Sequence, residues 1–230
     1  MFDWLVAFQS LLVLLTMAFL SWIVSLTKRD VSIVDSVWPL FFLAAMLFFY
    51  LNPSLNGPRS TWAFVLIGLW SLRLCAYLTW RNWGQPEDRR YQEIRGRNEP
   101  NFNFKSLVII FFFQAVLAWL VSLPILPVLK SGQALGGLDG LGIAIFIFGL
   151  AFESLADWQM SRFKARPDSR GQVMDQGIWR YSRHPNYFGE FCVWWGFYLL
   201  ALSAGAPFWV LISPLLMSIL LLKVSGVPLL

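Results

Sequence analysis

Seven long apolar stretches constrain the fold of this chain more than any other feature of its sequence. The first, residues 4–26, contains no charged residue and is long enough for a helix to cross a hydrocarbon core of about 30 Å. Asp3 precedes this run and Lys28 and Arg29 follow it, which is the reverse of the charge order in a cleaved signal peptide. The other stretches are residues 33–51, 61–80, 106–129, 141–158, 187–204 and 207–224. The sequence therefore predicts an all-α, polytopic integral membrane protein with about seven transmembrane helices.

The Lys and Arg residues test this count, because the cytoplasmic connections of membrane proteins collect positive charge. When the stretches cross the membrane alternately, most of the 18 basic residues fall on one side. These are Lys28, Arg29, Arg81, Arg89, Arg90, Arg95, Arg97, Lys105, Arg162, Lys164, Arg166, Arg170, Arg180, Arg183 and Lys223. Arg59 and Lys130 fall on the other side, and Arg73 lies within the third stretch. We therefore predict an N-terminus outside and a C-terminus in the cytoplasm, in a bacterial inner membrane or, in a eukaryote, in the endoplasmic reticulum.

Composition excludes a soluble globular domain, because 57% of the residues are hydrophobic and only 13% are charged. The net charge of +5 does not indicate nucleic acid, since the basic residues flank membrane spans and alternate with acidic ones. Membrane lipids and a polyanionic ligand are the expected partners, and no obligate protein partner is indicated. Cys75 and Cys192 lie in apolar runs without metal-ligand spacing, so no metal site is predicted. We treat residues 1–230 as one domain, in which residues 1–104 hold the first three helices and a charged connection.

Ionisable residues inside membrane spans are costly and require a partner or a polar cavity. Five such residues occur here: Asp35, Arg73, Glu153, Asp157 and Glu190. Glu153 and Asp157 are four residues apart, which places both carboxylates on one helical face. A buried network that only fixes helix register is the alternative to a ligand site.

The third span continues this pattern toward the charged connection. Arg73, Tyr77 and Arg81 recur every four residues and form a cationic stripe that suits a nucleotide, with Arg on phosphate and Tyr on a ring or ribose. Snorkelling of Arg81 to the membrane surface is an equal alternative for that residue. The following segment, residues 85–91, reads either as a solvated loop or as a cap that brings Arg89 or Arg90 near a phosphate.

Residues 183–190, with the sequence RHPNYFGE, contain the single histidine and join a basic loop to an apolar helix. Arg183 and His184 offer cationic donors, and Pro185 suits the first turn of a helix, whose backbone N–H groups attract an anion such as a pyrophosphate. An ordinary basic flank of a membrane helix is the alternative. The motif predicts a cofactor site at the membrane surface.

Together with PEDRRY at residues 86–91 and LKVSGVPLL at residues 222–230, this motif resembles a bacterial family of membrane proteins related to the C-terminal domain of steroid 5α-reductases and, more distantly, to sterol C14 and C7 reductases. The resemblance covers nearly the whole chain. It implies a seven-helix reductase that holds NADPH on the cytoplasmic side between the later helices, residues 105–230, and takes a lipophilic substrate from the bilayer. The cofactor-binding residues that the resemblance implies are Arg73, Asp157, Lys164, Arg180, Tyr181, Arg183, His184, Asn186, Tyr187 and Glu190. The cationic stripe and the acidic pair add Arg81 and Glu153 to this set.

The chain departs from the steroid enzymes at the substrate end of the site. Those enzymes carry a Gln-Glu pair on the second helix and a Tyr one turn before the third-helix Arg, whereas this chain has Asp35 in the second helix and Trp70 before Arg73. Asp35 and Tyr77 are therefore the candidate catalytic residues that would stabilise an enolate formed by hydride transfer to a conjugated C=C bond. The chain stops at Leu230 without the charged and aromatic tail of such proteins, a pattern typical of a truncated sequence.

Two other function classes remain open on the sequence. A membrane methyltransferase of the isoprenylcysteine or phospholipid type, which uses S-adenosylmethionine, has an Arg-His-Pro motif at a similar boundary, but it usually shows paired glutamates near its last helix. Residues 205–230 contain no acidic residue, which favours the reductase. A non-catalytic membrane scaffold would account for the spans but would leave Arg73 and the Glu153/Asp157 pair without a ligand.

Overall fold

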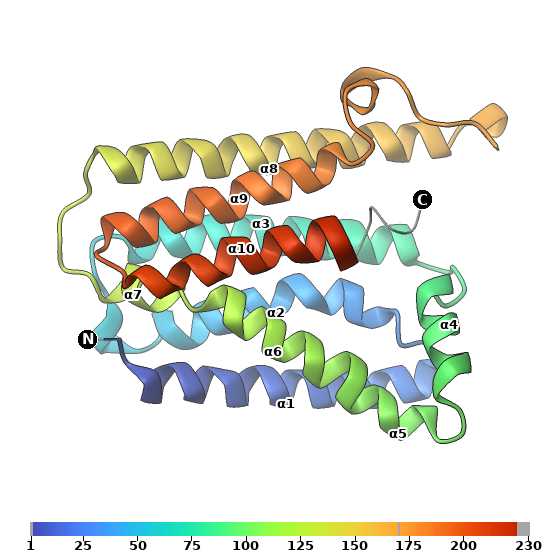
Figure 1. The fold of residues 1–230 in the computed structure, drawn as a ribbon, viewed down its shortest axis with the longest axis horizontal. Helices are drawn as coiled ribbons and strands as arrows, with labels where there is room; N and C mark the ends of the chain where they lie inside the picture. The colour runs from blue at the N-terminus through green and yellow to red at the C-terminus, as the bar shows by residue number, and fades with distance from the viewer. Residues whose placement is uncertain (1, 170, 225–230) are drawn as a thin grey trace. The chain divides into compact units, whose positions relative to one another are not determined.

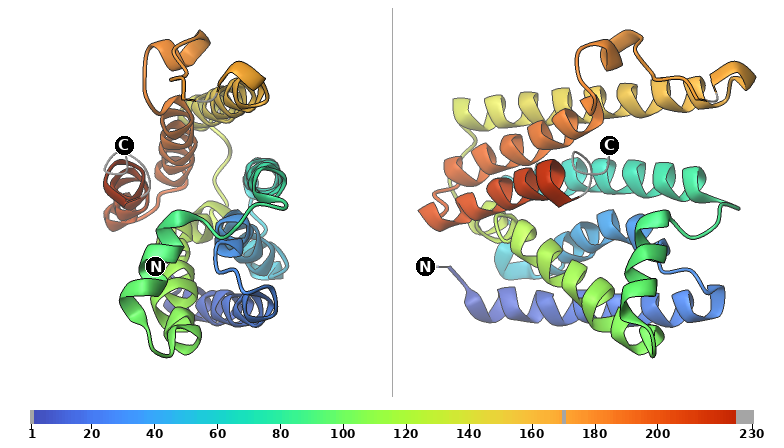
Figure 2. Two further views of the ribbon diagram at one scale, coloured as in Figure 1. Left: turned by 90° about the vertical axis from the view of Figure 1, so that its right-hand side faces the viewer. Right: turned by 45° about the vertical axis from the view of Figure 1, so that its right-hand side comes forward.

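The computed structural model describes residues 2–169 and 171–224, and these residues form helices and connections without a β-strand. The predicted all-α fold is confirmed. The chain divides into two compact units, Met1–Gly132 and Gln133–Leu230, so the fourth apolar stretch belongs with the first three. Figure 1 shows the helices of both units, and Figure 2 gives two further views of them.

Five helical segments of the described chain are long and apolar enough to cross a membrane, as in an integral membrane protein. They are α1 (Trp4–Lys28), α2 (Ile33–Tyr50), α3 (Ser60–Asn82), the run Phe102–Lys130, and α8 (Gly137–Lys164). The sixth predicted span is present as α9 (Pro185–Ser203), a helix that includes Asn186 and Glu190 and is not among the five. The seventh is a shorter apolar helical segment, Phe208–Lys223, which contains α10 (Ile212–Ile219).

In the first unit, α2 packs against α1, α3 and α6 (Phe113–Ser122). Phe41, Phe42 and Phe49 on α2 are fully buried, so aromatic side chains fill the centre of this unit. Two indole N–H groups join the fourth apolar run to α1: Trp119 donates to the Ala7 carbonyl at 2.7 Å, and Trp22 donates to the Asn103 carbonyl at 2.8 Å. The run itself contains α5 (Phe102–Ser106), a π-helical turn (Leu107–Phe112), α6 and α7 (Ile125–Lys130).

The charged segment after α3 contains a helix, α4 (Arg89–Asn98), whereas residues 85–88 before it form a non-helical connection. Asp88 begins it as an N-cap, and its carboxylate accepts a hydrogen bond from the Arg90 N–H at 2.9 Å. Salt bridges from Arg89 to Glu93 and from Glu93 to Arg97 follow the four-residue spacing of the outer face. Tyr91 is buried on the other side of the helix. Within this unit, α4 lies across the ends of neighbouring helices (Figure 1).

In the second unit, α8 and α9 pack along each other through glycines. A Cβ atom added at Gly149 would lie 2.5 Å from the Gly189 carbonyl oxygen, and one added at Gly196 would lie 2.6 Å from the Phe146 nitrogen. No side chain separates the two backbones at these points. At the other end of the pair, the buried Asp139 carboxylate accepts hydrogen bonds from the Gly136 N–H and from Ser203 Oγ, which ties the start of α8 to the end of α9.

Candidate functional site

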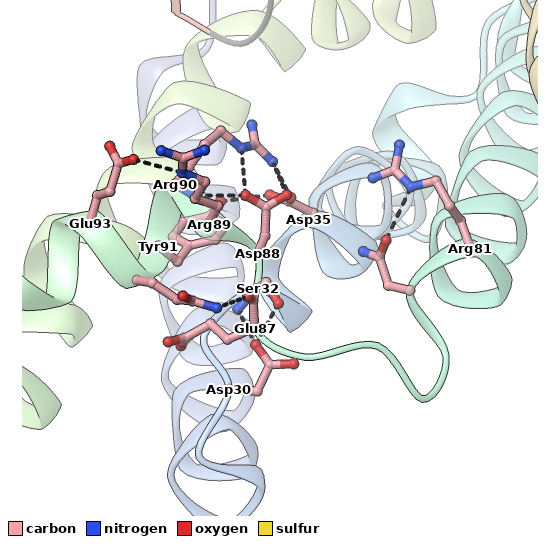
Figure 3. Close-up of polar contacts among 12 residues, drawn as sticks. Asp30, Ser32, Asp35, Arg81, Glu87, Asp88, Arg89, Arg90, Tyr91 and Glu93 are labelled. Atoms are coloured by element: carbon pink, nitrogen blue, oxygen red, sulfur yellow. Dashed lines mark hydrogen bonds and ion pairs between the residues drawn. The ribbon is translucent and has the colours of Figure 1, made fainter. Parts of the chain in front are cut away.

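A polar cluster in the first unit joins the start of α2 to α4, and we call it the Asp35 cluster: Asp35, Asp88, Arg90, Tyr91 and Gln114. Figure 3 shows the first four of these residues. One Asp35 oxygen accepts a hydrogen bond from the Arg90 guanidinium at 2.9 Å, and the other accepts from the Tyr91 hydroxyl at 2.6 Å. The Gln114 amide donates to the Tyr91 oxygen at 3.1 Å. Asp88 accepts from Arg90 at 3.0 Å. Two side chains of α4 therefore bind the Asp35 carboxylate, and Gln114 of α6 is linked to it through the Tyr91 hydroxyl.

Glu87 provides a second attachment between α4 and the segment before α2. Its carboxylate accepts hydrogen bonds from the Val31 N–H at 2.9 Å and from Arg95 at 2.7 Å. The Arg95 guanidinium also lies over the Phe102 ring, 4.3 Å from its centroid. The motif at residues 86–91 thus anchors α4 to the rest of the first unit.

Burial and neighbouring charges shift the pKa values of Asp88, Arg90 and Tyr91. Burial raises the pKa of Tyr91 well above its ordinary value, and the nearby Asp35 carboxylate raises it further, so the phenol stays neutral. Burial lowers the pKa of Arg90, but its bonds to Asp88 and the charge of Asp35 outweigh this effect and raise the pKa overall. Burial acts to raise the pKa of Asp88, but hydrogen bonds from Arg90 lower it overall.

Asp35, the first candidate catalytic residue, acts as a hydrogen-bond acceptor on both of its oxygens. Donation of a proton from this group would require Arg90 or Tyr91 to move away. Its assignment as a catalytic acid stays a prediction, and the Asp35 cluster gives it a well-defined alternative role as the anchor of α4. In one of the two interpretations of residues 85–91, Arg89 or Arg90 lies near a phosphate; in the structure, Arg90 is held by Asp35 and Asp88.

The predicted stripe on α3 is a continuous helical face. The Arg81 guanidinium lies over the Tyr77 ring, 5.8 Å from the centroid, and Arg81 also donates to the Asn82 side chain at 3.1 Å. An open groove of about 570 Å³ follows the same end of α3 and is lined by Ala76, Thr79, Trp80 and Trp83. Arg73, Tyr77 and Arg81 therefore share one helix of the first unit, while their roles toward a cofactor or substrate stay predictions.

In the second unit, the predicted acidic residues lie on the α8–α9 pair. Glu153 is 2% exposed, Asp157 is 5% exposed and Glu190 is 9% exposed. A Cβ atom added at Gly189 would lie 2.7 Å from the Glu153 Cβ. The Glu153 side chain therefore leaves α8 directly beside Gly189, the residue that precedes Glu190. The close helix packing thus brings a carboxylate of α8 next to the segment His184–Glu190.

The first turn of α9 carries the single histidine. His184 occupies the N-cap position and Pro185 the first turn, as the sequence predicted. The His184 ring stacks on the Tyr187 ring with a centroid distance of 4.9 Å and an interplanar angle of 9°. Burial lowers the pKa of His184, and the charge of Arg183 lowers it further, so the imidazole is neutral at pH 7. His184 therefore offers a neutral aromatic face rather than the cation expected from the sequence.

The connection before α9 is fastened to α8 by residues that sequence reasoning missed. The Gln159 side-chain oxygen accepts a hydrogen bond from the Ile178 N–H at 3.1 Å, and the Trp179 indole donates to the Ala156 carbonyl at 3.0 Å. Gly177 has a φ of +59° and lies against Gln159. The one available signal was an aromatic residue, Trp179, in a polar connection. Lys164 ends α8, and Arg180, Tyr181 and Arg183 are exposed near this attachment.

The predicted residues thus form two groups, one in each unit. Glu153, Asp157, Lys164 and the residues from Arg180 to Glu190 belong to the second unit, and Asp35, Arg73, Tyr77 and Arg81 belong to the first. Their assembly into one cavity stays a prediction. The part of the closing motif at residues 225–230 lies outside the described residues.

Comparison with known proteins identifies the family. A sequence profile described as "protein of unknown function (DUF1295)" matches residues 21–230. The chain belongs to this family. It is also similar to an uncharacterized protein of the fission yeast Schizosaccharomyces pombe, with 29% identity over 213 residues, covering 80% of this chain and 61% of the yeast protein. The chain thus spans less than two thirds of that relative, and no solved structure matches it.

Proposed function

We propose that this protein is a membrane-embedded reductase that uses NADPH to reduce a carbon–carbon double bond conjugated to a carbonyl in a lipophilic substrate. The observation that carries the proposal is the arrangement at one end of the α8–α9 pair. There, buried carboxylates lie beside a helix start that carries Arg183, His184 and Asn186, and a basic segment is fastened next to them. The five apolar helices support a substrate drawn from lipid.

The residues of this end of the pair fit a dinucleotide. His184 Nε2 and Asn186 Oδ1 are buried atoms without a hydrogen-bond partner among the described residues, so each can take a ligand group. N–H groups in the first turn of a helix have no partner within the helix and bind phosphate, and Arg180 and Arg183 add charge. Carboxylates such as Glu190 accept hydrogen bonds from ribose hydroxyls or from a carboxamide.

When bound, NADPH supplies a hydride from its nicotinamide ring. Hydride addition to the β-carbon of an enone leaves negative charge on the carbonyl oxygen, and a donor aimed at that oxygen stabilises the transition state. Asp35 and Tyr77 are the candidates for this role, and Asp35 already accepts hydrogen bonds from Arg90 and Tyr91. We therefore favour Tyr77 over Asp35 as the residue that acts on the substrate.

The proposal includes the seven-span topology with the nucleotide-binding end facing the cytoplasm. Its support is the accumulation of Lys and Arg on alternate connections. The membrane would be a bacterial inner membrane or an endoplasmic reticulum.

The test is a ligand titration of the purified protein in detergent with NADPH, NADH and S-adenosylmethionine. Nicotinamide fluorescence and the rise in melting temperature, which follows RT ln(1 + [L]/Kd), report binding. The reductase requires a response to NADPH. A response to S-adenosylmethionine alone would instead indicate a methyltransferase, and no response to any of the three would indicate a scaffold.

Variants locate the bound nucleotide. Asn186→Ala and Arg183→Ala should each weaken the NADPH response by about tenfold, since each removes a polar or charged contact. Arg97→Ala is the matched control. It removes the same charge from α4, in the first unit, where the Arg97 side chain is 80% exposed. Equal NADPH binding in all three variants would remove the His184–Glu190 segment from the site.

A further inference from the structure

The connection that leads into α9 rests on α8 through two side chains in its middle. Gln159 accepts a hydrogen bond from the Ile178 N–H, and Trp179 donates one to the Ala156 carbonyl. Ala156 and Gln159 are three residues apart and therefore share a face of α8, and Asp157 lies between them in sequence. The contact thus attaches the connection at the level of the buried Asp157.

The turn before Ile178 has a backbone conformation that favours glycine. Gly177 has a φ of +59°, and a Cβ atom there would lie 2.4 Å from the Gln159 side-chain oxygen. Any other residue would be strained by its backbone, and its Cβ would push the Gln159 amide away from its present position. Ile178 and Trp179 are partly buried, whereas Gln176 before them and Arg180 to Arg183 after them are exposed. The attachment therefore holds the centre of the segment and leaves the basic residues accessible.

We propose that Gln159 and Trp179 are positioning residues that hold Arg180 and Arg183 beside the start of α9 for an anionic ligand. This proposal rests on the function proposed above, in which that ligand is NADPH. Arg180 and Arg183 follow Trp179 by only one and four positions, so fixing the indole on α8 restricts where both guanidinium groups can reach. A segment ordered before binding does not lose that conformational entropy when the ligand arrives, and the affinity rises accordingly.

Three substitutions test the attachment without removing a ligand-binding residue. Gln159→Leu removes the acceptor, Trp179→Phe keeps an aromatic ring but removes the N–H, and Gln159→Glu keeps an oxygen acceptor. Gln172→Leu is the matched control, because Gln172 is exposed and only its backbone N–H makes a described hydrogen bond, to the Ser169 carbonyl.

Two measurements are made on the full-length protein in detergent: the rate of tryptic cleavage after Arg180 and Arg183, and the affinities for NADPH and for inorganic pyrophosphate. Gln159→Leu and Trp179→Phe should be cleaved several-fold faster and bind both ligands about tenfold more weakly. Gln159→Glu should keep the wild-type cleavage rate, and Gln172→Leu should keep both the rate and the affinities. The melting temperature without ligand should stay within about 2 °C in every variant, because the changed groups are partly exposed.

The outcomes separate this proposal from the reductase. Wild-type NADPH affinity in both Gln159→Leu and Trp179→Phe overturns the positioning role and leaves the reductase standing. Pyrophosphate binding that depends on Gln159 and Trp179, without any NADPH binding, overturns the reductase and supports the positioning role. Failure of the wild-type protein to bind either ligand overturns both.

Discussion

Replacing Tyr91 by Phe tests whether the Asp35 cluster holds α4 in place. The substitution keeps the buried ring and removes a hydroxyl that donates to Asp35 at 2.6 Å and accepts from Gln114 at 3.1 Å. A hydrogen bond to a charged partner contributes about 1.5–3 kcal/mol, so we expect Tyr91→Phe to destabilise the protein by about 2 kcal/mol. For a chain of this size, that loss lowers the melting temperature by about 4–8 °C.

A double-mutant cycle with Asp35→Asn assigns the loss to the Tyr91–Asp35 bond. In the Asp35→Asn background, the same tyrosine substitution should cost only about 1 kcal/mol, because the remaining bond joins two neutral groups. Thermal unfolding in detergent, followed by circular dichroism, measures all four proteins. Tyr181→Phe is the matched control. Tyr181 is 86% exposed, so this substitution should leave the melting temperature unchanged. A cost of Tyr91→Phe that is the same with Asp35 and with Asn would refute the assignment.

Three further predictions concern the helix pair, α4 and the histidine. Gly149→Ala should destabilise the protein by about 1–3 kcal/mol in the same unfolding assay, because its Cβ would overlap the α9 backbone; Gly140→Ala, with nothing within 4 Å, should not be destabilising. Because the pKa of Asp88 is lowered from 3.8 by Arg90, its contribution is complete above that value and is lost as the pH falls through the lower pKa of the folded state. Hydrogen exchange of α4 amides, corrected for the intrinsic rate, should therefore lose the Asp88 contribution, and accelerate, as the pH falls below 3.8. His184 should titrate below 6.5 in an NMR experiment on the folded protein; a midpoint above that value would contradict its burial beside Arg183.

The apolar helices could be predicted from sequence because a long uncharged apolar run satisfies its backbone hydrogen bonds in a membrane by forming a helix. The placement of Glu153 and Asp157 on a single buried face followed in the same way from helical periodicity. Even there the boundaries moved, since the fourth run begins at Phe102 and includes a π-helical turn before α6. The helical nature of α9 was also predictable, from the Pro at its start.

Three features could not be predicted: α4, the Asp35 cluster and the attachment of Trp179. The last two depend on contacts between residues distant in sequence, and α4 lacks a clear apolar period because most of its residues are charged or polar. In α4, apolar periodicity is reduced to Tyr91 and Ile94, and the helix signals that remain are the Asp88 cap and the Arg89–Glu93 spacing. The bonds from Asp35 to Arg90 and Tyr91 join residues 55 and 56 positions apart, and nothing in a single sequence pairs them. The attachment of Trp179 to α8 depends on a backbone carbonyl, which has no sequence signature at all.

Direct backbone contact between α8 and α9 also affects how this protein responds to its lipid surroundings. Where long side chains separate two helices, a thicker or thinner bilayer can slide one past the other by rotamer adjustment. At Gly149 and Gly189 the main chains touch, so such sliding would force carbonyl oxygens and Cα atoms into each other. In the proposed topology both helices cross the membrane, so a change in bilayer thickness should tilt them together, and the spacing between Glu153 and Glu190 should be the same in short-chain and long-chain lipids.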